Sequence, residues 1–208
     1  ALAIGGVEVH HLLLSPATCH EPVTGYQRFV SDTALLVIDM LNTYRHKDAE
    51  KLAPSVENIV DPVAGLIAKA AERGDVDLIY VNDNYGDFTA NQDDLVRQAL
   101  EGARPDLVKP IAPPEGVQFL QKVRHSAFYA TALAYLLRQS DTKCLILTGQ
   151  VTEQCILYTA LDAYIRHFQV MVPHDGVAHI NADLGKAALR MMEENMRAQI
   201  MPAEKCLD

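Results

Sequence analysis

The chain has 208 residues, of which 49% are hydrophobic and 22% are charged, a balance that is ordinary for one soluble globular domain with a substantial core. Its formal net charge is −9, and its 18 basic residues form no long run. This charge distribution argues against a nucleic-acid partner and against an anionic membrane surface. We therefore expect a small molecule as the partner of this protein.

The cysteines and the hydropathy pattern predict a cytoplasmic protein. No segment approaches about 18 uninterrupted apolar residues, so no membrane span is expected. The four cysteines lie far apart and form no CxxC pair, which argues against a zinc ribbon and indicates a reducing compartment. They are Cys19, Cys144, Cys155 and Cys206.

Residues 1–33 contain no convincing helix. They hold one strand-like stretch, residues 7–14, among turn-rich segments. We expect residues 1–33 to be an N-terminal arm and residues 34–208 to be a single domain.

From residue 34 onward, strand-like runs alternate with helical patterns. The runs are short and continuously apolar, as in strands that are buried on both faces. This alternation predicts an α/β protein with three layers, α/β/α, in which helices flank a parallel sheet on both faces. The strand-like runs are residues 34–39, 77–82, 143–149, 169–173 and, more weakly, 116–122, and the helical patterns are residues 55–74, 126–139 and 152–167.

Three chemically reactive side chains stand at the ends of these predicted strands. Ligands of such sheets bind beyond the carboxyl ends of the strands. Asp39 closes the first run, Lys122 ends the weaker run, and Cys155 follows residues 143–149 at the start of a helix, where the backbone favours a thiolate. Taken alone, each also has a plain structural reading, as a turn residue, a solvated charge or a small core residue.

Together these residues resemble the isochorismatase-like cysteine hydrolase superfamily, which includes nicotinamidases and N-carbamoylsarcosine amidohydrolases. The resemblance implies a Rossmann-like parallel sheet of about six strands, and a homo-oligomer, either a dimer or a tetramer. It is carried by the segments LLVIDMLNTY (35–44), KVRHSAFYATAL (122–133), LTGQVTEQCILYTALDAY (147–164) and ALRMMEENMRAQI (188–200).

The resemblance also implies a catalytic triad and an oxyanion hole. Asp39, Lys122 and Cys155 match the triad, with Asp39 as the base, Cys155 as the nucleophile and a thioester as the intermediate. The family places a cis peptide bond before the nucleophile turn, here between Gln150 and Val151. The N–H groups of Val151 and Cys155 would then stabilise the oxyanion.

Departures from the family pattern argue against a metal cofactor. Nicotinamidases share an Asp-x-His pair and a further histidine that bind a metal, but this chain has no histidine between His46 and His125. Asp83 and Asp87 without an imidazole would make at best a weak oxygen-ligand site. We therefore expect no cofactor and no metal, although a weak site near Asp83 stays open.

Five residues are candidate substrate-binding residues. Tyr44 keeps the aromatic wall of the family's pocket and adds a hydroxyl group, and Gln150 stands where the family often has an aliphatic residue. Asn82 and Asp83 follow a predicted strand, and Tyr158 lies one turn after the nucleophile. A turn or core role is the alternative for each.

The sequence and the resemblance together predict a metal-independent cysteine hydrolase, an amidohydrolase that cleaves a C–N bond of a small amide, ureide or carbamoyl compound. Two alternatives stay open. One is isochorismate hydrolysis, in which a vinyl ether is cleaved by acid chemistry that does not need the thiol of Cys155. The other is a catalytically silent binding domain that has kept the fold.

Overall fold

The structure, a computed structural model, describes residues 31–208. The strand-like stretch at residues 7–14 and nearly all of the expected arm lie outside the described residues. The first strand begins at Thr33, one residue before the expected start of the domain. The division into an arm and a domain otherwise stays a prediction.

A parallel sheet of seven strands forms the centre of the molecule, as the α/β prediction required. Its strand order is β3-β2-β1-β4-β5-β7, and β6 also pairs with β4. Every pairing is parallel. The strands are β1 (Thr33–Ile38), β2 (Val76–Asp83), β3 (Gln118–Lys122), β4 (Cys144–Gln150), β5 (Gln169–Pro173), β6 (Val177–Ala178) and β7 (Gln199–Met201).

Helices connect these strands, and none within residues 31–208 is long and apolar enough to cross a membrane. The α-helices are α1 (Ala49–Glu57), α2 (Val60–Glu72), α3 (Gln92–Leu100), α4 (Pro105–Val108), α5 (Leu133–Gln139), α6 (Leu157–Ile165) and α7 (Ala182–Met196). Two short 3₁₀ segments, Lys109–Ile111 and Ala203–Lys205, and one π-helical segment, Thr152–Ile156, complete the elements.

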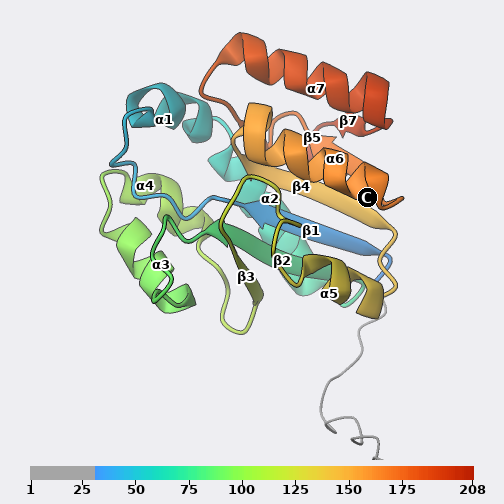
Figure 1. Ribbon diagram of the computed structural model, residues 1–208, viewed down its shortest axis with the longest axis horizontal. Coiled ribbons are helices and arrows are strands. Elements are labelled where there is room, and N and C mark those ends of the chain that lie inside the picture. The colour runs from blue at the N-terminus through green and yellow to red at the C-terminus, as the bar shows by residue number, and fades with distance from the viewer. Residues whose placement is uncertain (1–30) are drawn as a thin grey trace, which may run out of the picture.

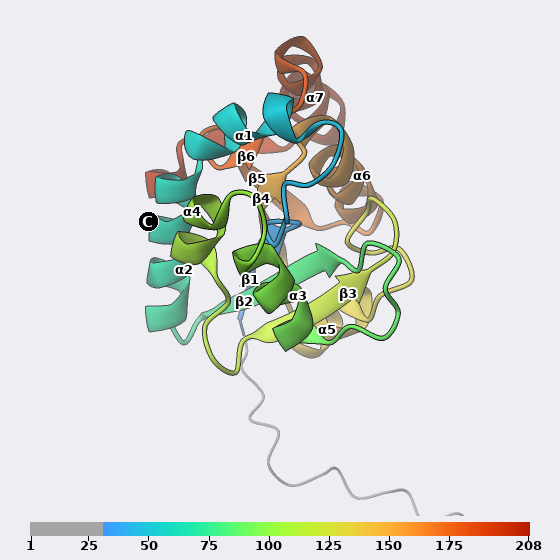
Figure 2. The same cartoon turned by 90° about the vertical axis from the view of Figure 1, so that its left-hand side faces the viewer.

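The helices cover both faces of the sheet, so the chain has the predicted three layers (Figures 1 and 2). Successive side chains of a strand point to opposite faces. Leu35 and Val37 of β1 belong to a core cluster with α1, α2, α3 and α4. Leu36 and Ile38 belong to a second cluster with α5, α6 and α7. Because β1 is buried on both faces, it reads as a continuous apolar run.

Two predicted helices differ from the observed ones. Residues 55–74 were expected to form one helix, but α1 ends at Glu57 and α2 begins at Val60. Residues 126–139 form a helix only from Leu133 onward. Before it, the hydroxyl of Ser126 accepts a hydrogen bond from the N–H of Phe128, and that of Thr131 accepts one from Leu133. Such side-chain bonds offer the backbone an alternative to the helix.

Candidate functional site

Four neighbouring strands bring the predicted reactive residues to one edge of the sheet. In the order β3-β2-β1-β4, Lys122 ends β3, Asp83 ends β2, and Asp39 directly follows β1. Lys122 and Asp83 are direct partners in the β2–β3 register. The carboxyl ends of these strands therefore gather side chains that lie up to 83 positions apart in the sequence.

Lys122 lies at the centre of this cluster and is only 1% exposed. Its Nζ atom lies 2.8 Å from Oδ2 of Asp39 and 3.5 Å from Oδ2 of Asp83. It also donates to Sγ of Cys155 over 3.7 Å. The structure thus brings Asp39, Lys122 and Cys155 together, with the ammonium group between the carboxylate and the sulfur.

Hydrogen bonds to the two neighbouring strands, β2 and β4, hold Asp39 in place. Its N–H donates to the carbonyl of Val81, and its Oδ1 accepts from the N–H of Asp83 at 2.8 Å. Its carbonyl accepts from Nε2 of Gln150 at 2.6 Å. The backbone of Asp39 has a φ of 55°, in the left-handed region, so these bonds maintain a conformation that most residues avoid.

Cys155 lies in the π-helical segment that precedes α6. There the N–H of Ile156 donates to the carbonyl of Val151, five residues earlier. The peptide bond between Gln150 and Val151 is cis, as the resemblance implied. Val151 is buried, and Cys155 is half-buried and lies against the core cluster of α6.

A close approach between β4 and β1 explains the glycine in the turn before Cys155. Gly149 has a φ of 115°, a conformation that side chains disfavour. A Cβ atom at this position would collide with the carbonyl oxygen of Ile38. Glycine is therefore needed where β4 passes β1 on its way to the nucleophile turn.

Burial and charge shift the pKa values of the three clustered groups. Burial raises the pKa of Asp39, although Lys122 and the thiol of Cys155 act in the opposite direction. Burial opposes the charge of Lys122, but Asp39, Cys155 and Asp83 outweigh it and raise the pKa of Lys122. Burial, and then the charge of Asp39, raise the pKa of Cys155 well above its ordinary value.

The effect of the helix start, which favours a thiolate, is therefore opposed by the surroundings of Cys155. Lys122 and a hydrogen bond from the Val151 backbone lower the pKa of Cys155, but burial and Asp39 outweigh them. A raised pKa of Cys155 favours the thiol over the thiolate, so a base that accepts its proton would assist the formation of a nucleophile.

Cys155 opens into a cavity of about 520 Å³. Five residues that the sequence predicted for the site line it, namely Asp39, Asp83, Gln150, Val151 and Cys155. Sequence reasoning missed the remaining lining residues, which come from the loops after β1, β2, β3 and β6 and from neighbouring helical segments. They are Asn42, Thr43, Arg45, His46, Leu52, Tyr85, Gln98, His125, Gln154 and Ile180.

Three predicted substrate-binding residues lie outside this lining. Tyr44 is buried in the core cluster beside α1. Asn82 is also buried, and its amide accepts from the N–H of Leu41 and donates to the carbonyl of the same residue, so it braces the loop after Asp39. Tyr158 is exposed, and the centroid of its ring lies 5.3 Å from that of His125 in a T-shaped arrangement. The contacts of these three side chains are therefore packing contacts or hydrogen bonds within the protein.

Tyr85 is a missed lining residue on which the charge of Asp39 acts. The residue is 51% exposed, but its hydroxyl reaches inward and donates to the carbonyl of Leu41 at 2.9 Å. Burial of the hydroxyl, and then the charge of Asp39, raise the pKa of Tyr85. The Asp83-Asn84-Tyr85 sequence was the available signal, because a tyrosine stands there in place of the histidine of an Asp-x-His pair.

The donor set near Asp83 is a poor match for a metal ion. Oδ1 of Asp83 accepts from the N–H of Tyr85, and Oδ2 faces the ammonium group of Lys122. Within residues 31–208 no group of three histidine, cysteine, aspartate or glutamate side chains is placed to hold a metal. The absence of a metal cofactor stays a prediction.

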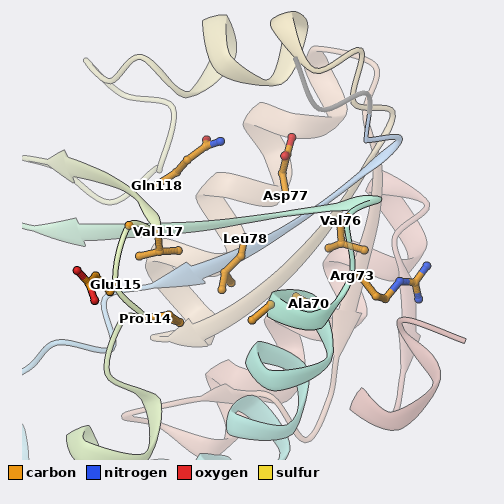
Figure 3. A pocket seen from close by; sticks show the side chains of 12 residues that line it. Ala70, Arg73, Val76, Asp77, Leu78, Pro114, Glu115, Val117 and Gln118 are labelled. Carbon is orange, nitrogen blue, oxygen red and sulfur yellow. The ribbon is translucent and has the colours of Figure 1, made fainter. Parts of the chain in front are cut away.

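A second hollow, of about 350 Å³, lies at the opposite end of β2 (Figure 3). Ala70, Leu78 and Val117 lie on one side of the sheet there, and Asp77 and Gln118 lie on the other. The lining contains no cysteine or histidine. This hollow therefore offers no nucleophile, and the cavity at Cys155 is the candidate active site.

Comparison with known proteins places the chain in a family. The Isochorismatase domain model matches residues 33–205, so the chain belongs to the isochorismatase family. It is 34% identical to an uncharacterised isochorismatase family protein of Bacillus subtilis, over 86% of this chain and 98% of that protein. It is 30% identical to the maleamate amidohydrolase of Pseudomonas putida, over 75% of this chain and 76% of that enzyme.

Solved structures agree with this assignment. The crystal structure of the Bacillus subtilis nicotinamidase superimposes with a TM-score of 0.64 at 26% identity, and the match covers 82% of this chain and 99% of that one. An isochorismatase-like hydrolase from Alkaliphilus metalliredigens shares the fold, with a TM-score of 0.69 at 23% identity over 85% of this chain and 98% of that one. The chain is an isochorismatase-family hydrolase that is related to amidases.

Proposed function

We propose that this protein is a metal-independent cysteine hydrolase that cleaves the C–N bond of a small amide, ureide or carbamoyl compound through a thioester. The position of Lys122 between Asp39 and Cys155, 2.8 Å from the carboxylate and 3.7 Å from the sulfur, is the main support for this proposal. An ammonium group placed there favours the ion that forms when the thiol loses its proton.

The first half of the reaction forms a thioester. Asp39 accepts the proton of the Cys155 thiol, and the thiolate attacks the carbonyl carbon of the substrate. The backbone N–H groups of Val151 and Cys155 are the proposed donors to the resulting oxyanion. When the C–N bond breaks, Asp39 returns the proton to the leaving nitrogen, and the acyl group stays on the sulfur.

The second half releases the acid. A water molecule loses a proton to Asp39 and attacks the thioester carbonyl. The sulfur leaves as a thiolate, and the proton on Asp39 returns to it, which regenerates the starting thiol. The raised pKa of Asp39 suits this role, because a carboxylate with a higher pKa is a stronger base.

The contacts of Cys155 favour this chemistry over the alternatives. Cleavage of a vinyl ether needs an acid but no nucleophile. The contact between Lys122 and Cys155 would therefore have no role in that reaction. A silent binding domain would not need a lysine buried between two carboxylates, since an unused buried charge is costly. The oligomeric state stays a prediction.

A panel of small amides, ureides and carbamoyl compounds tests the proposal. We expect release of ammonia or amine by the wild type and none above background by Cys155→Ala. Mass spectrometry after rapid acid quenching should show an acyl group on the peptide that contains Cys155. Because this side chain is half-buried, the variant should fold, which its thermal midpoint checks. Equal turnover by Cys155→Ala would refute the proposal.

A further inference from the structure

The rim of the Cys155 cavity carries three basic side chains. Arg45 and His46 lie on the loop that follows Asp39, and His125 lies on the loop that follows Lys122. All three are exposed, and all three line the same cavity as Cys155. A substrate that reaches the sulfur therefore passes beside them.

None of these three side chains is paired with a carboxylate in the part of the chain that the structure describes. Nη2 of Arg45 donates to the backbone carbonyl of Glu101 at 2.7 Å. The side-chain amide of Asn42 lies 3.3 Å from Nε2 of His46. The ring of His125 packs against Tyr158. Each is thus held by a neutral group, and Arg45 keeps a charge that no acidic side chain balances.

The carboxylates of the cavity are already engaged. Asp39 and Asp83 both lie within 3.5 Å of the ammonium group of Lys122. The chain as a whole has a net charge of −9, so a positive charge without an acidic partner at the rim of a cavity differs from the predominantly acidic chain around it. Such a charge favours an anionic ligand over a neutral or cationic one.

We propose that Arg45, with His46 and His125 beside it, binds a carboxylate group of the substrate. The substrates are then small amides, ureides or carbamoyl compounds that carry a carboxylate, an inference that rests on the proposed function. The guanidinium group is planar and keeps further N–H groups beyond the one that Glu101 accepts. Two parallel N–H groups match the two oxygens of a carboxylate, which makes arginine better suited than lysine.

Binding to the Cys155→Ala variant tests this subsite without turnover. The probes are succinamate and butyramide, which differ in that a carboxylate of the first replaces a methyl group of the second. Isothermal titration calorimetry, with competition by ligand-detected NMR, gives both dissociation constants. We expect succinamate to bind about tenfold more tightly or better, as one charge-assisted contact provides.

Two substitutions in the same background assign the effect to Arg45. Arg45→Gln should remove most of the preference for succinamate and leave the binding of butyramide unchanged. Arg190→Gln is the matched control, because Arg190 is an exposed arginine on α7 that pairs with Glu194. It removes the same charge outside the cavity and should leave the preference intact.

Equal binding of the two probes, or binding of neither, would overturn the carboxylate subsite. A preference for succinamate that persists in the Arg45→Gln variant would also overturn the subsite. The proposed function is judged separately, by turnover of the wild type. Hydrolysis of butyramide and succinamate at equal rates would support the hydrolase and reject the subsite. A preference for succinamate by a wild type that hydrolyses no compound of the panel would support the subsite and reject the hydrolase.

Discussion

Nζ of Lys122 lies 2.8 Å from Oδ2 of Asp39, and both side chains are almost fully buried, with exposures of 1% and 8%. A buried ion pair is costly to break, because removing one partner leaves the other as an uncompensated charge. The pair therefore ties the stability of the fold to the group that we assign as the base.

Lys122→Met should lower the free energy of unfolding by about 3–5 kcal/mol, because it leaves Asp39 buried without its partner. Hydrolysis should fall by about 100-fold or more, since the developing thiolate loses its counter-charge. Urea denaturation measures the first effect. The double variant Lys122→Met/Asp39→Asn should recover much of the stability and none of the activity. A double variant no more stable than Lys122→Met would contradict the pairing.

Gly149→Ala should lower the free energy of unfolding by about 2–5 kcal/mol, because the methyl group meets the carbonyl of Ile38 in a left-handed backbone. Gly65→Ala is the matched control. Gly65 lies inside α2 with no atom near its Cβ position, so alanine there should raise stability by about 0.5–1 kcal/mol. Thermal denaturation of both variants tests the contrast, and a similar small effect at both positions would rule it out.

Tyr44→Phe should leave the free energy of unfolding unchanged or raise it by up to about 1 kcal/mol. The hydroxyl of Tyr44 is buried without a hydrogen-bond partner, as is Oε1 of Gln150, and an unsatisfied buried polar group is destabilising. Tyr80→Phe is the control, because the hydroxyl of Tyr80 donates to the carbonyl of Ile111 at 3.0 Å.

The control variant should lose about 1 kcal/mol or more, since it leaves a buried carbonyl without its donor. Urea denaturation of the two variants side by side gives the comparison. A loss for Tyr44→Phe as large as that for Tyr80→Phe would mean that the Tyr44 hydroxyl is bonded, with Gln150 as the nearest candidate acceptor.

Chelators should leave hydrolysis unchanged. The oxygens of Asp83 are used by the N–H of Tyr85 and by Lys122, and the positive charge of Lys122 at 3.5 Å repels a cation. The measurement is activity after dialysis against EDTA, followed by addition of Mg²⁺, Mn²⁺ or Zn²⁺. A reversible loss would contradict the prediction of a metal-independent enzyme.

The sequence predicted the sheet well because its strands are buried on both faces and read as continuous apolar runs. The five expected strands are all present, and the ends of β1, β3 and β4 place Asp39, Lys122 and Cys155 at one edge of the sheet. The strands β6 and β7 were not predicted, since two or three residues are too few to show a period.

Other features depend on contacts between distant segments. The pKa of Cys155 follows from burial and from Asp39, 116 positions earlier, and not from the local helix start. Tyr85 and Arg45 line the cavity because their loops fold over the same sheet edge. No local pattern marks Arg45, whereas a glycine before a nucleophile turn or an aspartate after a strand is visible in the sequence.

The rate of Cys155 alkylation by iodoacetamide between pH 6 and 9, in wild type and Asp39→Asn, tests the central claim most directly. Peptide mass spectrometry provides Cys144 and Cys206 as internal references. The charge of Asp39 raises the pKa of Cys155, so its removal should lower that pKa and increase the thiolate fraction at each pH. The account therefore predicts faster labelling of Asp39→Asn near pH 7 together with loss of hydrolysis. Hydrolysis that survives the substitution would show that Asp39 is not the base that takes the proton of Cys155. Slower labelling of Asp39→Asn would show that the charge of Asp39 does not raise the pKa of Cys155.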